Sequence, residues 1–479
     1  MSDLDNTVKE INEFRSRHPT WRYASNATFQ ITGSLLAATQ SLYLYFYYFN
    51  VIGLDPWIIL LALSLFSIYD AINDPIIGFL VDRNTRLTKR WGRRFPWIAI
   101  GIIPWCLSLY LIFSAPSMTP GNPWPVFGWL MLSLIIFDTF GSLVGINIMA
   151  LRPDLFREEK ERQKLTVFWT YFDMIAMALG FIVPPLFIDP SNLKTSFALM
   201  GGVIAVIALI SAILFLPGSR EDKVVKERYF TGEYERMNFF KGFWTVLKHK
   251  SFIVYFIVLT SFTIATSMLT GNAPFVTNFL LQYAPGDEII IFVIFMLGAF
   301  ISVPFWILYL KRIKNNKKVL VVGGFALSAS LIPLTFYQTE IDMFIMLFIT
   351  GVAMGSMWAF FYTIIQASVV DDFVATTKKN QKGILLGVSI LLGRLVATLD
   401  ELIFASIHSI TGFPAGVANY ADLVSSGADV GLVLMGIRLL YGIIPGVILL
   451  IGTLIFWKYF PITQEKVSEN KQILEELGF

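Results

Sequence analysis

The chain has 479 residues, of which 55% are hydrophobic and 15% are charged, whereas a soluble globular protein carries about 25% charged residues. The formal net charge is +3 and the mean hydropathy is +0.65. These values exclude a disordered chain, an ordinary cytosolic enzyme and a nucleic-acid-binding protein. A single cysteine, Cys106, excludes an internal disulfide and a cluster of thiolate metal ligands. The composition therefore predicts an all-α protein that crosses a membrane several times.

Residues 1–24 mix acidic and basic side chains and lack the short apolar core of a signal peptide, so we predict a cytosolic lead-in helix. Twelve apolar runs follow, each long enough to cross the bilayer, which takes about 20 residues. They lie at 25–50, 57–81, 96–115, 126–150, 165–188, 195–216, 252–282, 289–310, 319–337, 343–370, 383–408 and 430–457. Their length and lack of alternation argue against a β-barrel.

Basic residues cluster in alternate loops between these runs. Together with both tails, these loops hold almost all of the 37 Lys and Arg residues, and the opposite loops hold Lys194. The positive-inside rule then places both termini in the cytosol. One missed or invented span would destroy this asymmetry, so it supports the count of twelve. We expect a multi-pass plasma-membrane protein that is a monomer.

A polar central segment, 217–251, separates six runs in 25–216 from six runs in 252–458, and 459–479 forms a polar tail. Two parallel six-helix halves are the architecture of major-facilitator transporters. The central segment ends in Met237–Lys250, which mixes aromatic and basic residues and suits an amphipathic helix at the membrane surface. A cytosolic extension of the seventh span is the alternative.

Carboxylates inside the predicted spans cost about 2.5–3.5 kcal/mol each at mid-membrane. Asp70 and Asp74 are four residues apart and share one helix face, with Asn73 beside them. Two close carboxylates repel unless a cation or proton intervenes, and carboxylate, amide and hydroxyl oxygens suit a small hard cation. We predict a cation site at these three side chains, to which Ser142 of span four adds a hydroxyl. The alternative is that the acids pair with Arg394 or stay protonated.

Other polar and aromatic residues in the spans are candidates for binding a substrate. Asp138 shares a face of span four with Ser142, and Asp173 lies in span five. In span eleven Arg394 precedes the pair Asp400 and Glu401, of which we expect Asp400 to face the outer vestibule. Aromatic rings stack on sugar faces, and the aromatic candidates include Trp358 and Tyr362. For any single aromatic residue, a lipid-facing or core position is the alternative.

One stretch carries a specific resemblance. Tyr69-Asp-Ala-Ile-Asn-Asp-Pro-Ile-Ile-Gly-Phe-Leu-Val-Asp-Arg83, followed by Trp91-Gly-Arg-Arg-Phe-Pro-Trp-Ile98, closely resembles the glycoside–pentoside–hexuronide:cation symporter family, whose best-known type is the melibiose permease. Around the loop between spans two and three, the sequence also resembles a motif of major-facilitator carriers, at Gly78, Asp82, Arg83 and Arg86. The resemblance extends more weakly over nearly the whole chain.

The resemblance implies residue roles that go beyond the spacing argument. It places a sodium, lithium or proton site at Asp70, Asn73, Asp74 and Ser142, with Arg394 where the melibiose type has a lysine. The sugar site departs from the family, because Ser34, Gly145 and Thr170 replace two aspartates and an arginine. Asp138 and Asp173 lie within two helix turns of those positions, so we expect a shifted polar site that also includes Thr170.

The sequence thus predicts cation-coupled symport of a sugar or glycoside by alternating access, with sodium or a proton as coupling ion and no other cofactor. We expect Arg83, Arg86, Arg93 and Arg94 to form a cytosolic gate with Asp82, Asp154, Asp371 or Asp372; plain topology signals are the alternative. The alternative cargo is a lysolipid or other amphiphile, which animal relatives of this family carry. A receptor or scaffold that does not transport is the alternative of another class. No His/carboxylate or Ser/His pairing falls at mid-membrane, which argues against an enzyme.

Overall fold

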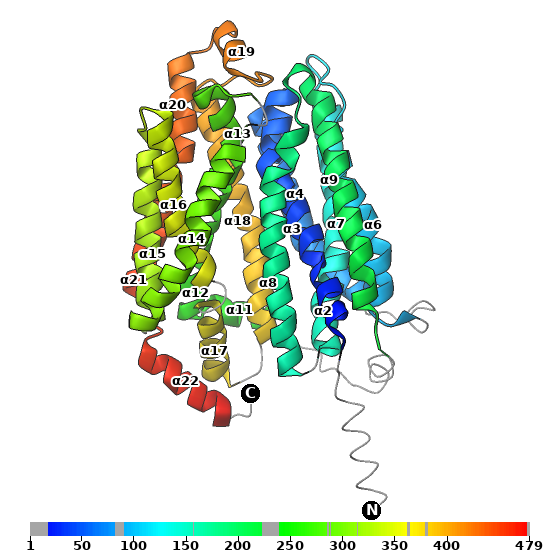
Figure 1. Ribbon diagram of the computed structural model, residues 1–479, viewed down its shortest axis with the longest axis vertical. Helices are drawn as coiled ribbons and strands as arrows, with labels where there is room; N and C mark the ends of the chain where they lie inside the picture. The colour runs from blue at the N-terminus through cyan, green and yellow to red at the C-terminus, as the bar shows by residue number, and fades with distance from the viewer. Residues whose placement is uncertain are drawn as a thin grey trace, which may run out of the picture. The chain divides into compact units, whose positions relative to one another are not determined.

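A computed structural model shows an all-α protein (Figure 1). It describes residues 18–81, 91–156, 158–222, 239–284, 287, 289–313, 315–361, 365–378 and 382–476. The chain divides into two compact units, Met1–Glu235 and Arg236–Phe479, called here the N-terminal and C-terminal units. Among the described residues, β pairing is limited to an isolated bridge between Thr119 and Asn122. The predicted all-α class is confirmed.

The N-terminal unit contains long helices joined by short turns. In chain order they are α2 (Thr20–Ala27), α3 (Phe29–Phe46), the π-helix η1 (Tyr47–Val51), α4 (Pro56–Val81), α6 (Phe95–Ile112), α7 (Trp124–Leu155), α8 (Glu159–Ile182), the 3₁₀ turns η2 (Pro184–Phe187) and η3 (Pro190–Asn192), α9 (Leu193–Phe215) and η4 (Leu216–Ser219). Helix α7 packs against α4 and α6, while α3 packs against α8 and α9. These contacts bring residues of spans two and four, and of spans one and five, together.

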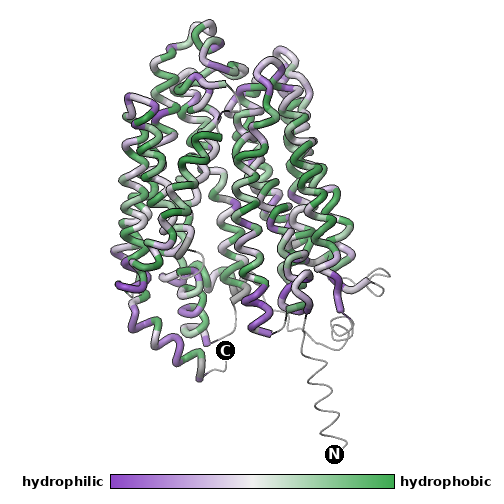
Figure 2. Tube along the Cα trace, in the orientation of Figure 1, coloured by the Kyte–Doolittle hydropathy of each residue, from purple (hydrophilic) through white to green (hydrophobic). Residues whose placement is uncertain are grey.

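The C-terminal unit has the same long-helix character. Its elements are α11 (Phe239–Leu247), α12 (Lys250–Gly271), α13 (Ala273–Phe275), the π-helix η5 (Val276–Leu281), α14 (Ile289–Ile313), α15 (Asn316–Leu331), the 3₁₀ turn η6 (Ile332–Thr335), α16 (Glu340–Phe360), α17 (Gln366–Thr377), α18 (Lys382–Ile410), α19 (Tyr420–Ser425), α20 (Val430–Tyr441), α21 (Ile443–Tyr459) and α22 (Gln464–Glu476). Figure 2 shows hydrophobic residues along most of the long helices, whereas α22 is largely hydrophilic.

By length and hydropathy, ten stretches among the described residues can cross a membrane. The first and eleventh predicted spans are missing from those ten. Helix α3 is 18 residues long, but Gln30, Gln40 and several hydroxyl residues lower its hydropathy. Helix α18 is 29 residues long but carries Arg394, Asp400 and Glu401, and parts of it lie outside the described side chains. Both have the length of a span, so the count of twelve stays a prediction at these two helices.

The tenth predicted span contains α16 and the first part of α17, and residues 362–364 between them lie outside the described residues. The twelfth is interrupted. It divides into α20 and α21 at Gly442, where a Cβ atom would lie 2.3 Å from Oγ1 of Thr335. That hydroxyl accepts the N–H of Ile443 at 2.9 Å. The close approach of η6 therefore needs glycine at the break.

The amphipathic segment before the seventh span forms its own helix. Between α11 and α12, His249 has extended backbone angles, φ −81° and ψ 112°. Helix α11 packs against α12 and α18. A continuous extension of the seventh span is therefore wrong, because the chain turns at His249. The location of α11 at the membrane surface stays a prediction.

A carboxylate from the end of the sixth span caps the third. Glu221 is buried and accepts the backbone N–H groups of Arg93, Arg94 and Phe95 at 2.5–3.0 Å. Gly92 has φ +104°, and a Cβ there would collide with this carboxylate. An acid at a helix N-terminus satisfies donors that have no partner within the helix and complements its dipole. The start of α6 is thus fixed by a residue that follows α9.

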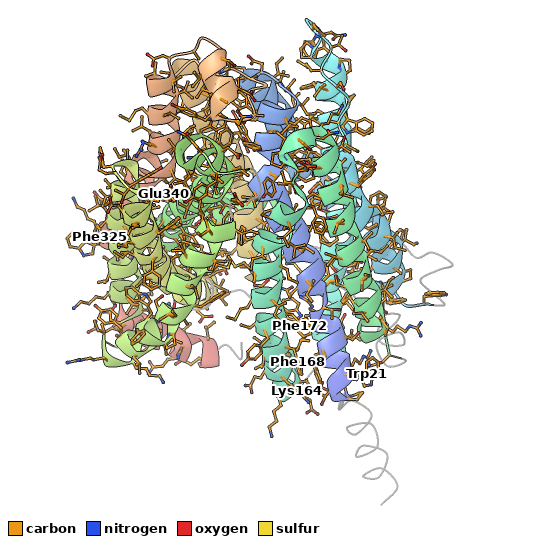
Figure 3. All side chains as sticks on the ribbon, turned by 45° about the horizontal axis from the view of Figure 1, so that its top comes forward. Trp21, Lys164, Phe168, Phe172, Phe325 and Glu340 are labelled. Carbon is orange, nitrogen blue, oxygen red and sulfur yellow. The ribbon has the colours of Figure 1, made fainter. Side chains whose placement is uncertain are left out.

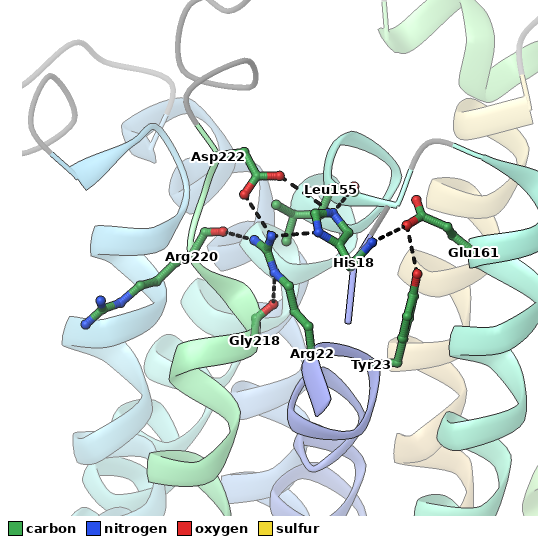
Figure 4. A network of polar contacts seen from close by, with 8 residues as sticks. All are labelled: His18, Arg22, Tyr23, Leu155, Glu161, Gly218, Arg220 and Asp222. Atoms are coloured by element: carbon green, nitrogen blue, oxygen red, sulfur yellow. Dashed lines mark hydrogen bonds and ion pairs between the residues drawn. The ribbon is translucent and has the colours of Figure 1, made fainter. Parts of the chain in front are cut away.

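A polar cluster ties the start of the N-terminal unit to its end (Figure 4). Arg22 donates to the carboxylate of Asp222 at 2.8 Å and to the backbone oxygens of Gly218 and Arg220. Glu161 accepts the backbone N–H of His18 at 3.0 Å and the hydroxyl of Tyr23 at 2.7 Å. We call this cluster, which also includes the carbonyl of Leu155, the N-terminal clasp. It attaches α2 to α7, α8 and η4.

Candidate functional site

The predicted cation ligands lie where α4 packs against α7. Asp70 and Asn73 are buried, at 3% and 5% exposure, and Ser142 of α7 is also buried. The side-chain amide of Asn73 donates from Nδ2 to Oδ2 of Asp138 at 2.9 Å. Asp138, which the sequence suggested for the substrate, therefore contacts the predicted cation site directly.

The amide of Asn73 is held at both ends. The hydroxyl of Tyr69 donates to its Oδ1 at 3.3 Å and forms a hydrogen bond with Oγ1 of Thr139 at 2.6 Å. Sequence reasoning missed both residues as site residues. Tyr69 was detectable, because it lies four residues before Asn73 on the same helix face. Thr139 could not be detected from the sequence, because its contact with Tyr69 depends on how far α7 is shifted along α4.

One carboxylate beside this contact, that of Asp74, has capacity for a ligand. Oδ1 of Asp74 is buried and accepts no hydrogen bond from the described residues. A buried carboxylate oxygen without a donor is costly and is stabilised by a proton or cation. The described residues contain no group of three or more His, Cys, Asp or Glu side chains that could hold a metal ion. The cation site at Asp70, Asn73, Asp74 and Ser142 stays a prediction.

Helix α7 has open space on the face that carries these residues. A Cβ atom at Gly145, one turn from Ser142, would meet no atom within 4 Å. In contrast, a Cβ at Gly141 would lie 2.9 Å from Nε1 of Trp105. One side of α7 is therefore packed against α6, while the face with Gly145 leaves room for another group. Gly78 of α4, a predicted gate residue, also borders open space.

A second polar cluster joins α3 and α8. Oδ1 of Asp173 accepts hydrogen bonds from Oγ of Ser34 at 2.7 Å and from Nε2 of Gln30 at 3.2 Å. The structure thus brings together Asp173 and the position where the resemblance expects an aspartate. The hydroxyl of Thr170, one turn away, donates to the backbone oxygen of Thr166 at 3.0 Å. Gln30 was missed, although it lies one turn before Ser34.

Helix α8 is the least covered of the ten candidate spans, with 17% of its window buried. Figure 3 shows Lys164, Phe168 and Phe172 following one another along it. Tyr171 is 65% exposed. This helix therefore presents aromatic side chains next to the exposed Asp173, so that apolar and polar surfaces adjoin.

In the C-terminal unit, the acidic pair of α18 is buried. Asp400 is 7% exposed and accepts a hydrogen bond from Oγ of Ser267 at 2.5 Å. The expectation that it faces an outer vestibule is therefore wrong, because α12 covers it. Oδ1 of Asp400 and Oε2 of Glu401 have no hydrogen-bond partner among the described residues. Arg394 is half-buried on the same helix.

The other predicted residues have mixed surroundings. Trp358 of α16 is half-buried and packs edge-to-face on Phe295 of α14, with ring centroids 6.0 Å apart. Asp371 is half-exposed on α17, whereas its neighbour Asp372 accepts hydrogen bonds from Ser251 at 2.7 Å and Asn470 at 3.1 Å. Asp372, a predicted gate partner, thus connects its own helix α17 to α12 and α22. Of the other predicted gate residues, Arg94 donates from Nη1 to Oδ1 of Asn147 at 3.4 Å. Tyr362, Asp82, Arg83 and Arg86 lie outside the described residues.

Comparison with known proteins places the chain in a class. Residues 26–464 match the family described as MFS/sugar transport protein. The chain is 25% identical, over 94% of its length and 88% of the relative's, to sodium-dependent lysophosphatidylcholine symporter 1-B of Danio rerio. It is 21% identical, over 93% of its length and 88% of the relative's, to the sphingosine-1-phosphate transporter MFSD2B of Xenopus tropicalis. The nucleoside transporter NupG has a similar fold, with 12% identity, a TM-score of 0.63 and coverage of 92% of this chain and 99% of that one.

The fold and these matches define a multi-pass membrane transporter of the major-facilitator type, not an enzyme. The chain belongs to the MFS/sugar transport protein family. The predicted resemblance is confirmed at the level of this transporter family, whereas the melibiose-permease type is not supported, because the similar relatives are named as lysophosphatidylcholine symporters.

Proposed function

We propose that this protein is a cation-coupled symporter, with sodium as the coupling ion and a single-chain amphiphile of the lysophospholipid class as the cargo. The observation that carries the coupling is the α4–α7 cluster, in which Asn73 donates to Asp138 and Oδ1 of Asp74 is buried without a donor among the described residues. The relatives that cover almost the whole chain are named as sodium-dependent lysophosphatidylcholine symporters, which supports both the ion and the cargo.

The cluster supplies a physical route from cation to substrate. A bound cation lowers the repulsion between Asp70 and Asp74, which otherwise opposes closure around the site. Asn73 carries the effect to α7, because its amide is held between Tyr69 and Asp138. Coupling requires that the cation bind one transport state more tightly than the other. Gly145, which lies on the same face of α7 as Asp138 and Ser142, borders open space.

The sugar expectation has weaker support than the amphiphile alternative. It rests on the family description and on the resemblance, and the residues of the galactoside site are replaced by Ser34, Gly145 and Thr170. A lysophospholipid instead needs a polar contact next to an apolar surface, and α8 presents Asp173 beside the exposed Tyr171 and the half-buried Phe172. We place the protein in the plasma membrane with both termini in the cytosol, from the distribution of Lys and Arg.

Purified protein in lipid vesicles tests the proposal. We expect an inward sodium gradient to drive uptake of lysophosphatidylcholine and not of melibiose, and we expect Asp74→Asn to abolish the sodium stimulation. A potassium gradient is the ion control, and Glu469→Gln on α22, an exposed acid outside the predicted cation site and gate, is the charge control. Uptake of melibiose with no uptake of lysophosphatidylcholine would restore the sugar assignment, and equal uptake with and without sodium would remove the coupling assignment.

A further inference from the structure

Arg152 lies in the last turn of α7, among polar and aromatic side chains. Its Nε donates to Oδ1 of Asn26 at 3.3 Å. Its guanidinium lies over the ring of Trp169, 3.0 Å from the centroid, and 5.5 Å from the centroid of Phe29. No acidic side chain in the described part of the chain forms an ion pair with it. Its position in the last helical turn compensates only part of the charge, through the helix dipole.

The surroundings hold this guanidinium in one place. Asn26 is 1% exposed, and its Nδ2 donates to Oγ of Ser219 at 3.3 Å, which fixes the direction of its amide. Trp169 supplies a flat face against which the guanidinium stacks. Three helices, α2, α7 and α8, therefore position Arg152 from different sides, which is more than a side chain extending to water requires.

Two donors of this cluster are buried without an acceptor. They are Nη2 of Arg152 and Nε1 of Trp169, and neither makes a hydrogen bond with the described residues. Buried donors are normally paired, and a buried charge is normally paired as well. A single anionic group with several oxygens would meet both needs. Arginine binds phosphate through parallel N–H groups, which makes a phosphate ester the matching chemistry.

We propose that Arg152 and Trp169 bind the phosphate ester group of the amphiphile that the transporter carries. This inference rests on the proposed function and makes it more specific, because it selects phosphate-bearing amphiphiles over uncharged ones of equal chain length. The same chemistry is present in a diacyl phospholipid of the surrounding bilayer and in free phosphate. The experiment therefore includes both sources.

Binding to the full-length protein in a phosphate-free maltoside detergent tests the site. The probes are lysophosphatidylcholine, a monoacylglycerol with the same acyl chain, diacyl phosphatidylcholine as competitor, and inorganic phosphate. We expect Arg152→Gln to weaken lysophosphatidylcholine binding about 10- to 100-fold, the range for loss of charged hydrogen bonds, and to leave monoacylglycerol binding unchanged. Arg152→Lys keeps the charge and should lose less. Trp169→Phe keeps the ring face, removes the N–H and should also weaken binding.

Arg220→Gln is the matched control, because Arg220 is exposed and its side chain points away from the clasp in Figure 4. Its binding should equal that of the unaltered protein. The inference is overturned if Arg152→Gln binds lysophosphatidylcholine normally, if both probes lose affinity equally, or if phosphatidylcholine competes as well as lysophosphatidylcholine. If the unaltered protein binds no lysophospholipid, the proposed function fails by itself. The phosphate site is then tested by whether inorganic phosphate raises the unfolding temperature of the protein. A rise that Arg152→Gln removes supports the site, and the absence of a rise overturns it.

Discussion

At the scale of single residues, Asn73 joins two helices through one amide group. Its oxygen accepts from Tyr69 on its own helix, and its nitrogen donates to Asp138 on α7. Each bond fixes the other, because rotating the amide would place an oxygen against the carboxylate of Asp138. The arrangement therefore sets both the direction of Asn73 and the distance between α4 and α7 beside the predicted cation site.

Asp138→Asn separates the two roles of Asp138. The new amide oxygen still accepts from Asn73, so we expect normal folding. The charge is lost, so we expect the protein to need about tenfold more sodium for half-maximal uptake, which corresponds to one charge-assisted interaction. Uptake measured against sodium concentration gives this value. An unaltered sodium requirement would mean that Asp138 only orients Asn73.

Residue placement could be predicted from sequence where it depends on one helix. The shared face of Asp70, Asn73 and Asp74 follows from helical spacing, and α4 runs through all three. The contact from Asn73 to Asp138, and that from Ser34 to Asp173, depend on the register between helices. Spacing within one helix does not determine that register, so Asp138 was assigned to the substrate alone.

At the scale of elements, the start of α6 depends on a residue that follows α9. Glu221→Ala should leave three N–H groups at that start without an acceptor, and we expect unfolding to become easier by about 1–3 kcal/mol. Glu221→Gln keeps the acceptor for Arg94 and Phe95 but turns an NH2 group toward the N–H of Arg93 and loses the charge, so its cost should be smaller than that of Glu221→Ala but measurable. Thermal unfolding of the purified protein measures both. Equal stability of Glu221→Ala and the unaltered protein would contradict the capping role.

The turn between α11 and α12 should respond to pH. Burial lowers the pKa of His249 below its ordinary value, and the charge of Asp372, 3.8 Å away, opposes this in part. The unfolded chain then takes up a proton before the folded one. Stability is therefore full above about pH 6.5, the ordinary value for histidine, and falls as the pH drops toward the lowered pKa.

His249→Gln tests this, because it removes the titrating group and keeps a polar side chain. We expect the unfolding temperature of the unaltered protein to fall more steeply between about pH 6.5 and 5 than that of the variant. Parallel profiles would show that other groups cause the pH dependence.

At the scale of the whole molecule, the predicted topology makes a labelling experiment simple. Cys106 is the single cysteine and is buried, so the unaltered protein should react little with a membrane-impermeant maleimide. We expect a cysteine introduced as Ser426→Cys to be labelled on intact cells. A cysteine introduced as Ser468→Cys in α22 should react only after the cells are permeabilised. The reverse pattern would invert the topology.

The helical architecture was predictable because hydrophobic length is a property of each segment alone. The first and eleventh spans are harder to identify, because polar residues in α3 and α18 lower the hydropathy by which a span is recognised. The break at Gly442 was not predictable, because it results from η6 lying against the helix. The cargo was harder to predict, because the coupling residues of the family are retained while those of the sugar site are not, and the named relatives favour the lysolipid alternative over the sugar.

The N-terminal clasp bears on how shortened versions of this protein should be designed. A deletion that stops at residue 24, the end of the predicted lead, would remove His18, Arg22 and Tyr23. The carboxylates of Asp222 and Glu161 would then lose donors on which they depend. For expression and crystallisation, trimming should therefore stop before His18, and a purification tag should be attached upstream of it.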